Sequence, residues 1–137
     1  MTRRILWADD DLFYYKSFEE ELAQTFEIDI QRNADFFWKA LVGHEPSYYS
    51  GIIMDIILPY GEIVRAEKAE SGLKTGLALV EMVKHAEAYK NIPIVIFTIR
   101  DAGDVDEVGQ RYGIPVFRKS QVRIDEFVET IGETFVK

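Results

Sequence analysis

Residues 51–59 read GIIMDIILP, a run of apolar side chains interrupted by one acid, Asp55. A second run without polar alternation, PIVIF, occupies residues 93–97. Continuously apolar runs of this length are typical of central strands that are buried on both faces of a parallel sheet. A carboxylate inside such a strand needs a partner or a proton, because burial disfavours its charge. Asp55 is therefore either a buried acid held by backbone N–H groups or a functional group.

Short apolar runs alternate along the chain with stretches of helical periodicity. The clearest helix lies near the C-terminus, where apolar residues recur at i, i+3, i+4, i+7 and i+11 from Ile124 to Phe135. Further helices are expected over 15–22, 35–42, from residue 76 onward and over 104–112, and strands over 4–8, 27–31, 51–56, 94–98 and 115–117. This alternation predicts an α/β domain with a doubly wound, five-stranded parallel sheet in the flavodoxin-like order 2-1-3-4-5, covered by five helices.

The composition fits one domain that spans residues 1–137 and folds as an ordinary globule. Of the 137 residues, 47% are hydrophobic and 29% are charged. The absence of cysteine excludes disulfides, thiolate catalysis and zinc–thiolate sites. A net charge of −8 argues against direct binding to nucleic acid. The apolar run after the first arginines is too short for a signal peptide or a membrane span, so we expect a cytoplasmic protein without membrane contact.

Polar residues stand where four of the expected strands end. In doubly wound sheets, sites form beyond the carboxyl ends of the strands. The candidates are Asp9 and Asp10 after the first strand, Asp55 in the third, Thr98 closing the fourth and Lys119 after the fifth. Each is ambiguous alone, because acids often begin helices and a single threonine or lysine after a strand is commonly a turn residue or solvated. Asp11, the last acid of LWADDD at 6–11, is assigned to the start of the first helix.

Taken together, and with Pro59 four positions after Asp55, these residues resemble a response-regulator receiver domain over nearly the whole chain. The combination is specific, although each member alone is weak. The resemblance implies that Asp55 is the phosphoacceptor. It also implies that Thr98 and Lys119 contact the oxygens of the phosphoryl group.

The same resemblance implies a Mg²⁺ site. Its ligands would be Asp9, Asp10, Asp55 and the backbone carbonyl of Ile57. The chemistry calls for such a set independently, because a carboxylate that attacks a charged phosphoryl group needs a divalent cation to neutralise charge. Mg²⁺ prefers oxygen ligands and keeps positions open for water and phosphate.

The resemblance further implies how the domain acts. The phosphoryl group would come from a histidine kinase or a phosphotransfer protein, and the output would be a protein-interaction surface read by an unknown downstream protein. The domain would catalyse only its own phosphorylation and dephosphorylation, so it is not expected to be an enzyme. Because the last expected helix ends at the C-terminus, we expect a stand-alone domain without an output domain.

Three positions depart from the usual receiver pattern. Ser120 follows Lys119 where proline is common, so a trans peptide bond is expected there. Val116 stands where an aromatic switch residue is usual, and Phe117 is predicted on the opposite face of the strand. Ile99 stands where a small residue is usual and is expected to narrow access to the phosphoryl group.

The largest departure is an inserted loop at residues 60–75, YGEIVRAEKAESGLKT, between the third strand and the third helix. An insertion of this length costs little closure entropy. It is either a solvated flap or a lid or docking element, since it emerges beside Asp55.

Other functions fit the sequence less well. A phosphohydrolase with an aspartate nucleophile would need a second acid where Ile57 stands, and a flavodoxin-like cofactor site would need a phosphate loop after the first strand. The main alternative is a receiver-like interaction module that no longer depends on phosphorylation. The departures at Ile99, Val116 and Ser120 keep this alternative open.

Overall fold

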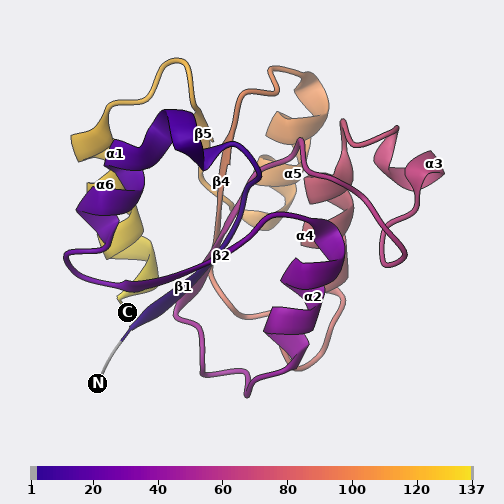
Figure 1. The fold of residues 1–137 in the computed structure, drawn as a ribbon, viewed down its shortest axis with the longest axis horizontal. Coiled ribbons are helices and arrows are strands. Elements are labelled where there is room, and N and C mark those ends of the chain that lie inside the picture. The colour runs from indigo at the N-terminus through magenta and orange to yellow at the C-terminus, as the bar shows by residue number, and fades with distance from the viewer. Residues whose placement is uncertain (1–2, 137) are drawn as a thin grey trace.

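The computed structural model describes residues 3–136 and contains a five-stranded parallel sheet (Figure 1). The strands are β1 (Arg4–Ala8), β2 (Glu27–Gln31), β3 (Gly51–Met54), β4 (Ile94–Thr98) and β5 (Val116–Arg118). They lie in the order β2-β1-β3-β4-β5, so the predicted order is confirmed.

Two strands differ from the prediction in their bounds. β3 ends at Met54, so that Asp55 follows the strand and does not lie within it. The carboxylate of Asp55 accepts the N–H of Ile57 at 3.3 Å, and this local bond turns the chain out of the strand. β5 begins at Val116 and ends at Arg118, one residue later than expected at each end; Pro115 does not begin the strand because it has no N–H to donate to the sheet.

Five helices of seven or more residues match the predicted ones, with two short helical turns in addition. The long helices are α1 (Lys16–Leu22), α2 (Ala34–Val42), α4 (Thr75–Lys84), α5 (Gly103–Tyr112) and α6 (Ile124–Phe135). The short ones are the 3-10 helix η1 (Leu12–Tyr15), which leads into α1, and α3 (Ala66–Ala69) inside the inserted loop. Among residues 3–136, none of these helices has the length and apolar character needed to cross a bilayer.

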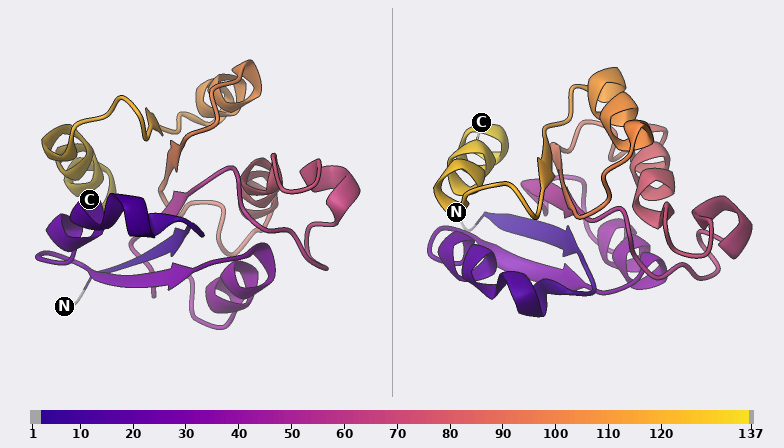
Figure 2. Two further views of the ribbon diagram at one scale, coloured as in Figure 1. Left: turned by 45° about the horizontal axis from the view of Figure 1, so that its top comes forward. Right: turned by 90° about the horizontal axis from the view of Figure 1, so that it is seen from above.

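The helices form two layers around the sheet (Figures 1 and 2). α1 and α6 cover one face, where the ring of Trp7 packs beside those of Phe97 and Phe127, each at a centroid distance of 6.0 Å. α2, α4 and α5 cover the other face, where Ile52 and Met54 are fully buried. Both faces of β3 are therefore inside the protein, which explains why its sequence is apolar without alternation.

The inserted loop, residues 60–75, is anchored to the rest of the protein. Ala69 of α3 is fully buried, and α3 lies at the outer edge of the helix layer beside α4 (Figure 1). The carboxylate of Asp35 accepts the N–H groups of Glu62 and Ile63 at 3.1 and 2.9 Å, and Leu58 donates its N–H to the carbonyl of residue 72 at 3.2 Å. These contacts anchor the loop at several points, although most of its residues are exposed, and its role as a flap, a lid or a docking element stays a prediction.

Gly76, in the first turn of α4, brings this helix against the backbone that carries Asp55. It donates its N–H to the carbonyl of Ile56 at 2.9 Å. A Cβ atom on Gly76 would lie 2.1 Å from the carbonyl oxygen of Asp55 and 2.6 Å from the Cα of Ile56. Both neighbours are backbone atoms, so the close approach requires glycine.

We predict that Gly76→Ala lowers the free energy of unfolding by about 2 kcal/mol, because the added methyl group must displace the backbone around Asp55. Gly132→Ala is the matched control: it lies inside α6, its added Cβ would meet nothing within 4 Å, and it should raise stability by about 1 kcal/mol. Urea unfolding followed by circular dichroism measures both. Equal effects of the two substitutions would contradict the close contact.

Candidate functional site

The hydrogen-bond ladder of the sheet continues past the strand ends and fixes the predicted site residues. Asp55 donates its backbone N–H to the carbonyl of Ala8 at 2.9 Å, and Lys119 donates its N–H to the carbonyl of Thr98 at 2.9 Å. Asp9 donates its N–H to β2 at 3.0 Å. The side chains of these residues therefore leave the sheet at one edge from fixed backbone positions. Asp9 is fully buried, and Asp55 is 2% exposed.

The ammonium group of Lys119 contacts three carboxylates at this edge. Its Nζ lies 3.0 Å from Oδ2 of Asp55, 2.6 Å from Oδ1 of Asp11, and 3.1 and 2.9 Å from the two oxygens of Asp9. The rings of Tyr15 and Phe97 flank it at 5.0 and 5.4 Å from their centroids. The prediction that Lys119 reaches Asp55 is confirmed, and the side chain of Lys119 is fully buried.

The charges of this cluster shift one another's pKa values. Burial raises the pKa of Asp9 to about 8, and a hydrogen bond with Asp11 acts in the same direction. Burial also raises the pKa of Asp55, although Lys119 and a hydrogen bond with Thr98 oppose this shift. Burial disfavours the charge of Lys119, but the attraction of Asp55 and Asp9 outweighs it and raises the pKa of this ammonium group.

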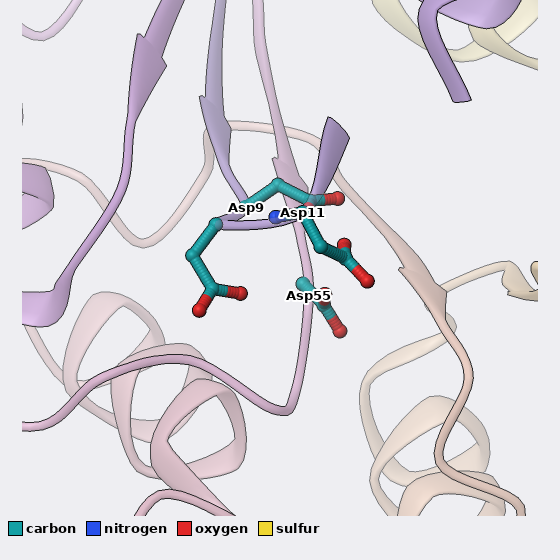
Figure 3. A group of neighbouring side chains, drawn as sticks. Asp9, Asp11 and Asp55 are labelled. Carbon is teal, nitrogen blue, oxygen red and sulfur yellow. The ribbon is translucent and has the colours of Figure 1, made fainter. Parts of the chain in front are cut away.

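The acidic residues of the cluster fit a divalent cation. One carboxylate oxygen from each of Asp9, Asp10, Asp11 and Asp55 lies within 4.8 Å of the others; Figure 3 shows three of the four side chains. Oδ2 of Asp9 is buried, and Nζ of Lys119 lies 2.9 Å from it. Four carboxylates around one ammonium leave an excess of negative charge. An all-oxygen set with this excess suits Mg²⁺.

The structure shows a different role for Asp11 from the predicted one, the start of the first helix. Asp11 occupies the N-cap position of η1 but makes no side-chain capping bond. Its carboxylate binds Lys119 instead, and its N–H donates to Oδ1 of Asp9 at 3.0 Å. Three acids in a row after a strand could have signalled a third cluster member. The partner that decides the matter, Lys119, is 108 residues away in the sequence.

No protein-family model and no curated protein matches this sequence. Many solved structures share its fold. A receiver domain protein from Methanospirillum hungatei is 19% identical with a TM-score of 0.73, over 99% of this chain and 95% of that one. The phosphorylated cyanobacterial phytochrome response regulator RcpA is 16% identical with a TM-score of 0.73, over 100% and 96% of the two chains. A Chloroflexus aurantiacus protein assigned as a response regulator is 17% identical with a TM-score of 0.76, over the whole of both chains.

The chain has the receiver fold of response regulators. Its site departs from the usual receiver pattern at the positions that the sequence analysis predicts. No peptide bond among residues 3–136 is cis, so the bond between Lys119 and Ser120 is trans as expected. Val116 packs on the face covered by α5, and Phe117 packs on the opposite face, 5.4 Å from the ring of Phe127.

The predicted effect of Ile99 on access to the site and the predicted metal ligand at Ile57 stay predictions. The side chain of Ile99 is 49% exposed beside the site, and its effect on access to Asp55 is untested. The carbonyl of Ile57 is the other predicted metal ligand, and the contact observed for this residue is through its N–H to Asp55. Asp10 is exposed and belongs to the four-carboxylate set, as its predicted metal role requires.

Metal-free protein should lose stability as the pH rises from about 5 to 8. The pKa of Asp9, about 8 in the folded protein, lies above its ordinary value of 3.8, so the folded state holds a proton that the unfolded state releases. Asp55 acts in the same direction. The lowered pKa of Asp11 and the raised pKa of Lys119 contribute stability that stays constant across this window.

Mg²⁺ should therefore raise the melting temperature more at pH 8 than at pH 5, because it replaces the proton on the carboxylates. Differential scanning fluorimetry with EDTA or Mg²⁺ measures this. Asp9→Asn should flatten the pH dependence, whereas Asp125→Asn, at an exposed pair on α6, should not. A melting temperature that rises between pH 5 and 8 in EDTA would contradict the buried, protonated carboxyl.

Replacement of Lys119 by methionine should lower the free energy of unfolding of the metal-free protein by about 3 kcal/mol, because it leaves three carboxylates facing one another without a cation. Mg²⁺ should restore part of the loss. Lys16→Met is the control: Lys16 is exposed and lies 3.9 Å from Glu19, a pair worth less than about 1 kcal/mol. Chemical denaturation measures both variants, and a Lys119→Met protein as stable as Lys16→Met would rule out the cluster as a stabilising unit.

Proposed function

We propose that this protein is a phosphoacceptor signalling domain in which Asp55 receives a phosphoryl group from a histidine kinase or a phosphotransfer protein. The observation that carries the proposal is the contact of Lys119 with Asp55 at 3.0 Å inside a group of four carboxylates. A nucleophilic carboxylate, a fixed ammonium and a set of cation ligands are the three parts that such a transfer needs. The receiver fold supports the proposal, since one structure of that fold is a phosphorylated response regulator.

The residues of the site divide the chemistry between them. An oxygen of Asp55 attacks the phosphorus atom, the bond from phosphorus to the donor's leaving group breaks, and an acyl phosphate forms on Asp55. Lys119 and Thr98 favour the ionised form of the Asp55 carboxyl before the attack, because both oppose the rise in its pKa that burial causes. After the transfer, the same ammonium and hydroxyl groups would bind the phosphoryl oxygens.

The metal would be held by Asp9, Asp10 and Asp55 together with the carbonyl of Ile57. When bound, Mg²⁺ supplies positive charge that neutralises the phosphoryl oxygens during transfer. Lys119 cannot replace it, because one ammonium group already faces three carboxylates. The negative charge of the site's own carboxylates is therefore the reason why a divalent ion would be needed.

The output of this domain would be a shift in its protein-interaction surface. Thr98 is fully buried at the end of β4, directly before the segment that leads into α5. Movement of its hydroxyl toward a new phosphoryl group would bias the position of that segment. The domain would act on its own aspartate and on no separate substrate, and a downstream protein would bind the altered surface.

One observation favours a second candidate, a receiver-like interaction module that does not depend on phosphorylation. The ion contacts of Lys119 already satisfy Asp55 and Asp11 without phosphate or metal. A protein that used this cluster only for stability would keep the same contacts. The two candidates differ in one property, which is whether Asp55 accepts a phosphoryl group.

The test is to incubate the protein with acetyl phosphate and Mg²⁺ and to measure its intact mass. Wild type and Asp125→Asn should each gain one phosphoryl group, whereas Asp55→Asn and wild type in EDTA should gain none. Asp125→Asn is the matched control because it makes the same change at an exposed acid of α6. A wild-type protein that gains no mass, or an Asp55→Asn protein that gains it equally, would contradict the proposal and favour the interaction module.

A further inference from the structure

A series of ion pairs and hydrogen bonds links the inserted loop to Thr98, and the proposed function does not involve it. Arg100 donates its backbone N–H to Oγ1 of Thr98 at 3.2 Å, and its guanidinium group donates two hydrogen bonds, of 3.2 and 2.8 Å, to the carboxylate of Asp104. Asp104 also lies 3.3 Å from Nζ of Lys74, the last residue before α4. Lys74 in turn lies 2.9 Å from Oε2 of Glu70.

The bond from Arg100 fixes the position of the hydroxyl oxygen of Thr98. A hydroxyl group has one proton to donate and lone pairs that accept. Because Oγ1 of Thr98 accepts the N–H of Arg100, one of its lone pairs is engaged and its proton stays available for an acceptor at the site. Thr98 is fully buried at the end of β4, which pairs with β3, the strand that leads to Asp55.

Asp104 keeps the backbone of Arg100 in place. A carboxylate that accepts two parallel bonds from a guanidinium group is more rigid than a single-bonded partner. Asp104 lies in the first turn of α5, where the helix dipole favours a negative charge. The side chains of Arg100 and Asp104 are 18% and 27% exposed, so solvent screens their attraction less than it screens a fully exposed pair.

Lys74 connects this pair to the backbone of Asp55. Its N–H donates to the carbonyl of Ala69 in α3 at 2.8 Å, which fixes its position at the end of the inserted loop. Two residues later, Gly76 packs directly on the carbonyl of Asp55. The contacts thus link the backbone of Asp55 to the hydroxyl of Thr98 through Lys74, Asp104 and Arg100.

We propose that Arg100 and Asp104, braced by Lys74 at the end of the inserted loop, are positioning residues that hold the hydroxyl oxygen of Thr98 in place at the edge of the sheet where Asp55 lies. The proposal rests on the proposed function, because the orientation of Thr98 affects a reaction only if Asp55 is phosphorylated. It gives the inserted loop a role that differs from a lid, since the loop acts through the backbone and ion contacts of Lys74 without covering the site.

The first test compares Asp104→Asn with Glu107→Gln. Glu107 lies on the same helix and also pairs with an arginine, Arg111, but has no link to Thr98. With acetyl phosphate and Mg²⁺, Asp104→Asn should be phosphorylated about three- to tenfold more slowly than wild type, while Glu107→Gln should match wild type. The melting temperatures of the two variants should be close, because Asp104 loses two partly exposed ion pairs and Glu107 loses one, and such pairs are each worth less than about 1 kcal/mol.

A double-mutant cycle separates positioning from a general structural effect. In a Thr98→Ala background the hydroxyl is absent, so Asp104→Asn should cause no further loss of rate. A structural effect of Asp104→Asn would slow the Thr98→Ala protein as much as it slows wild type. Lys74→Met, compared with Lys90→Met at an exposed pair on another segment, serves as a second variant if Asp104→Asn does not fold; it should slow phosphorylation in the same way.

The outcomes are distinct. If wild type is phosphorylated and Asp104→Asn is phosphorylated as fast as Glu107→Gln, the positioning role is overturned and the proposed function stands. An equal loss of rate with and without Thr98 also overturns it. Wild type that gains no phosphoryl mass overturns the proposed function, and the positioning role falls with it.

Discussion

The ion contacts between Lys119 and three carboxylates are the interaction on which the site end of the sheet depends. Two carboxylates about 5 Å apart repel each other by roughly 3 kcal/mol at an effective dielectric constant near 20. Burial adds a desolvation penalty for each charge, which is why Asp9 holds a proton up to a pH of about 8. One ammonium group offsets part of this repulsion and leaves the excess negative charge that a divalent cation would neutralise. Stability and the capacity to bind metal thus arise from the same contacts.

The rest of the fold serves to bring these charges to one place. The ladder of the parallel sheet extends past β1, β3 and β5 and sets the backbone of Asp9, Asp55 and Lys119. Helix layers on both faces keep water away from the sheet, and Gly76 allows α4 to press against the chain that carries Asp55. The inserted loop is held by contacts at both ends, at Asp35 on one side and through Lys74 on the other. It therefore reinforces the edge of the sheet at which the site lies.

Local patterns in the sequence predicted most of the architecture. Three of the five strands have the predicted bounds, because their apolar runs end sharply at polar residues or turns. The convergence of Asp9, Asp55, Thr98 and Lys119 could also be predicted, since the carboxyl ends of parallel strands share one edge. The pairing of Asp11 with Lys119 and the bridge from Lys74 to Asp104 could not, because both join residues that are distant in the sequence and depend on side-chain geometry. The short helix α3 was missed for a related reason: four residues carry too little periodicity, and tertiary contacts such as the burial of Ala69 stabilise it.

The central claim is that the carboxylate of Asp55, and no other group of the cluster, forms an acyl phosphate. Asp9 and Asp11 contact the same ammonium group, so the position of the modification decides between them. Borohydride reduces an acyl phosphate of aspartate to homoserine, which marks the modified residue permanently. Peptide mass mapping after treatment with acetyl phosphate, Mg²⁺ and borohydride should find homoserine at position 55 alone. Homoserine at position 9, 10 or 11, or an unmodified peptide at position 55, would contradict the claim.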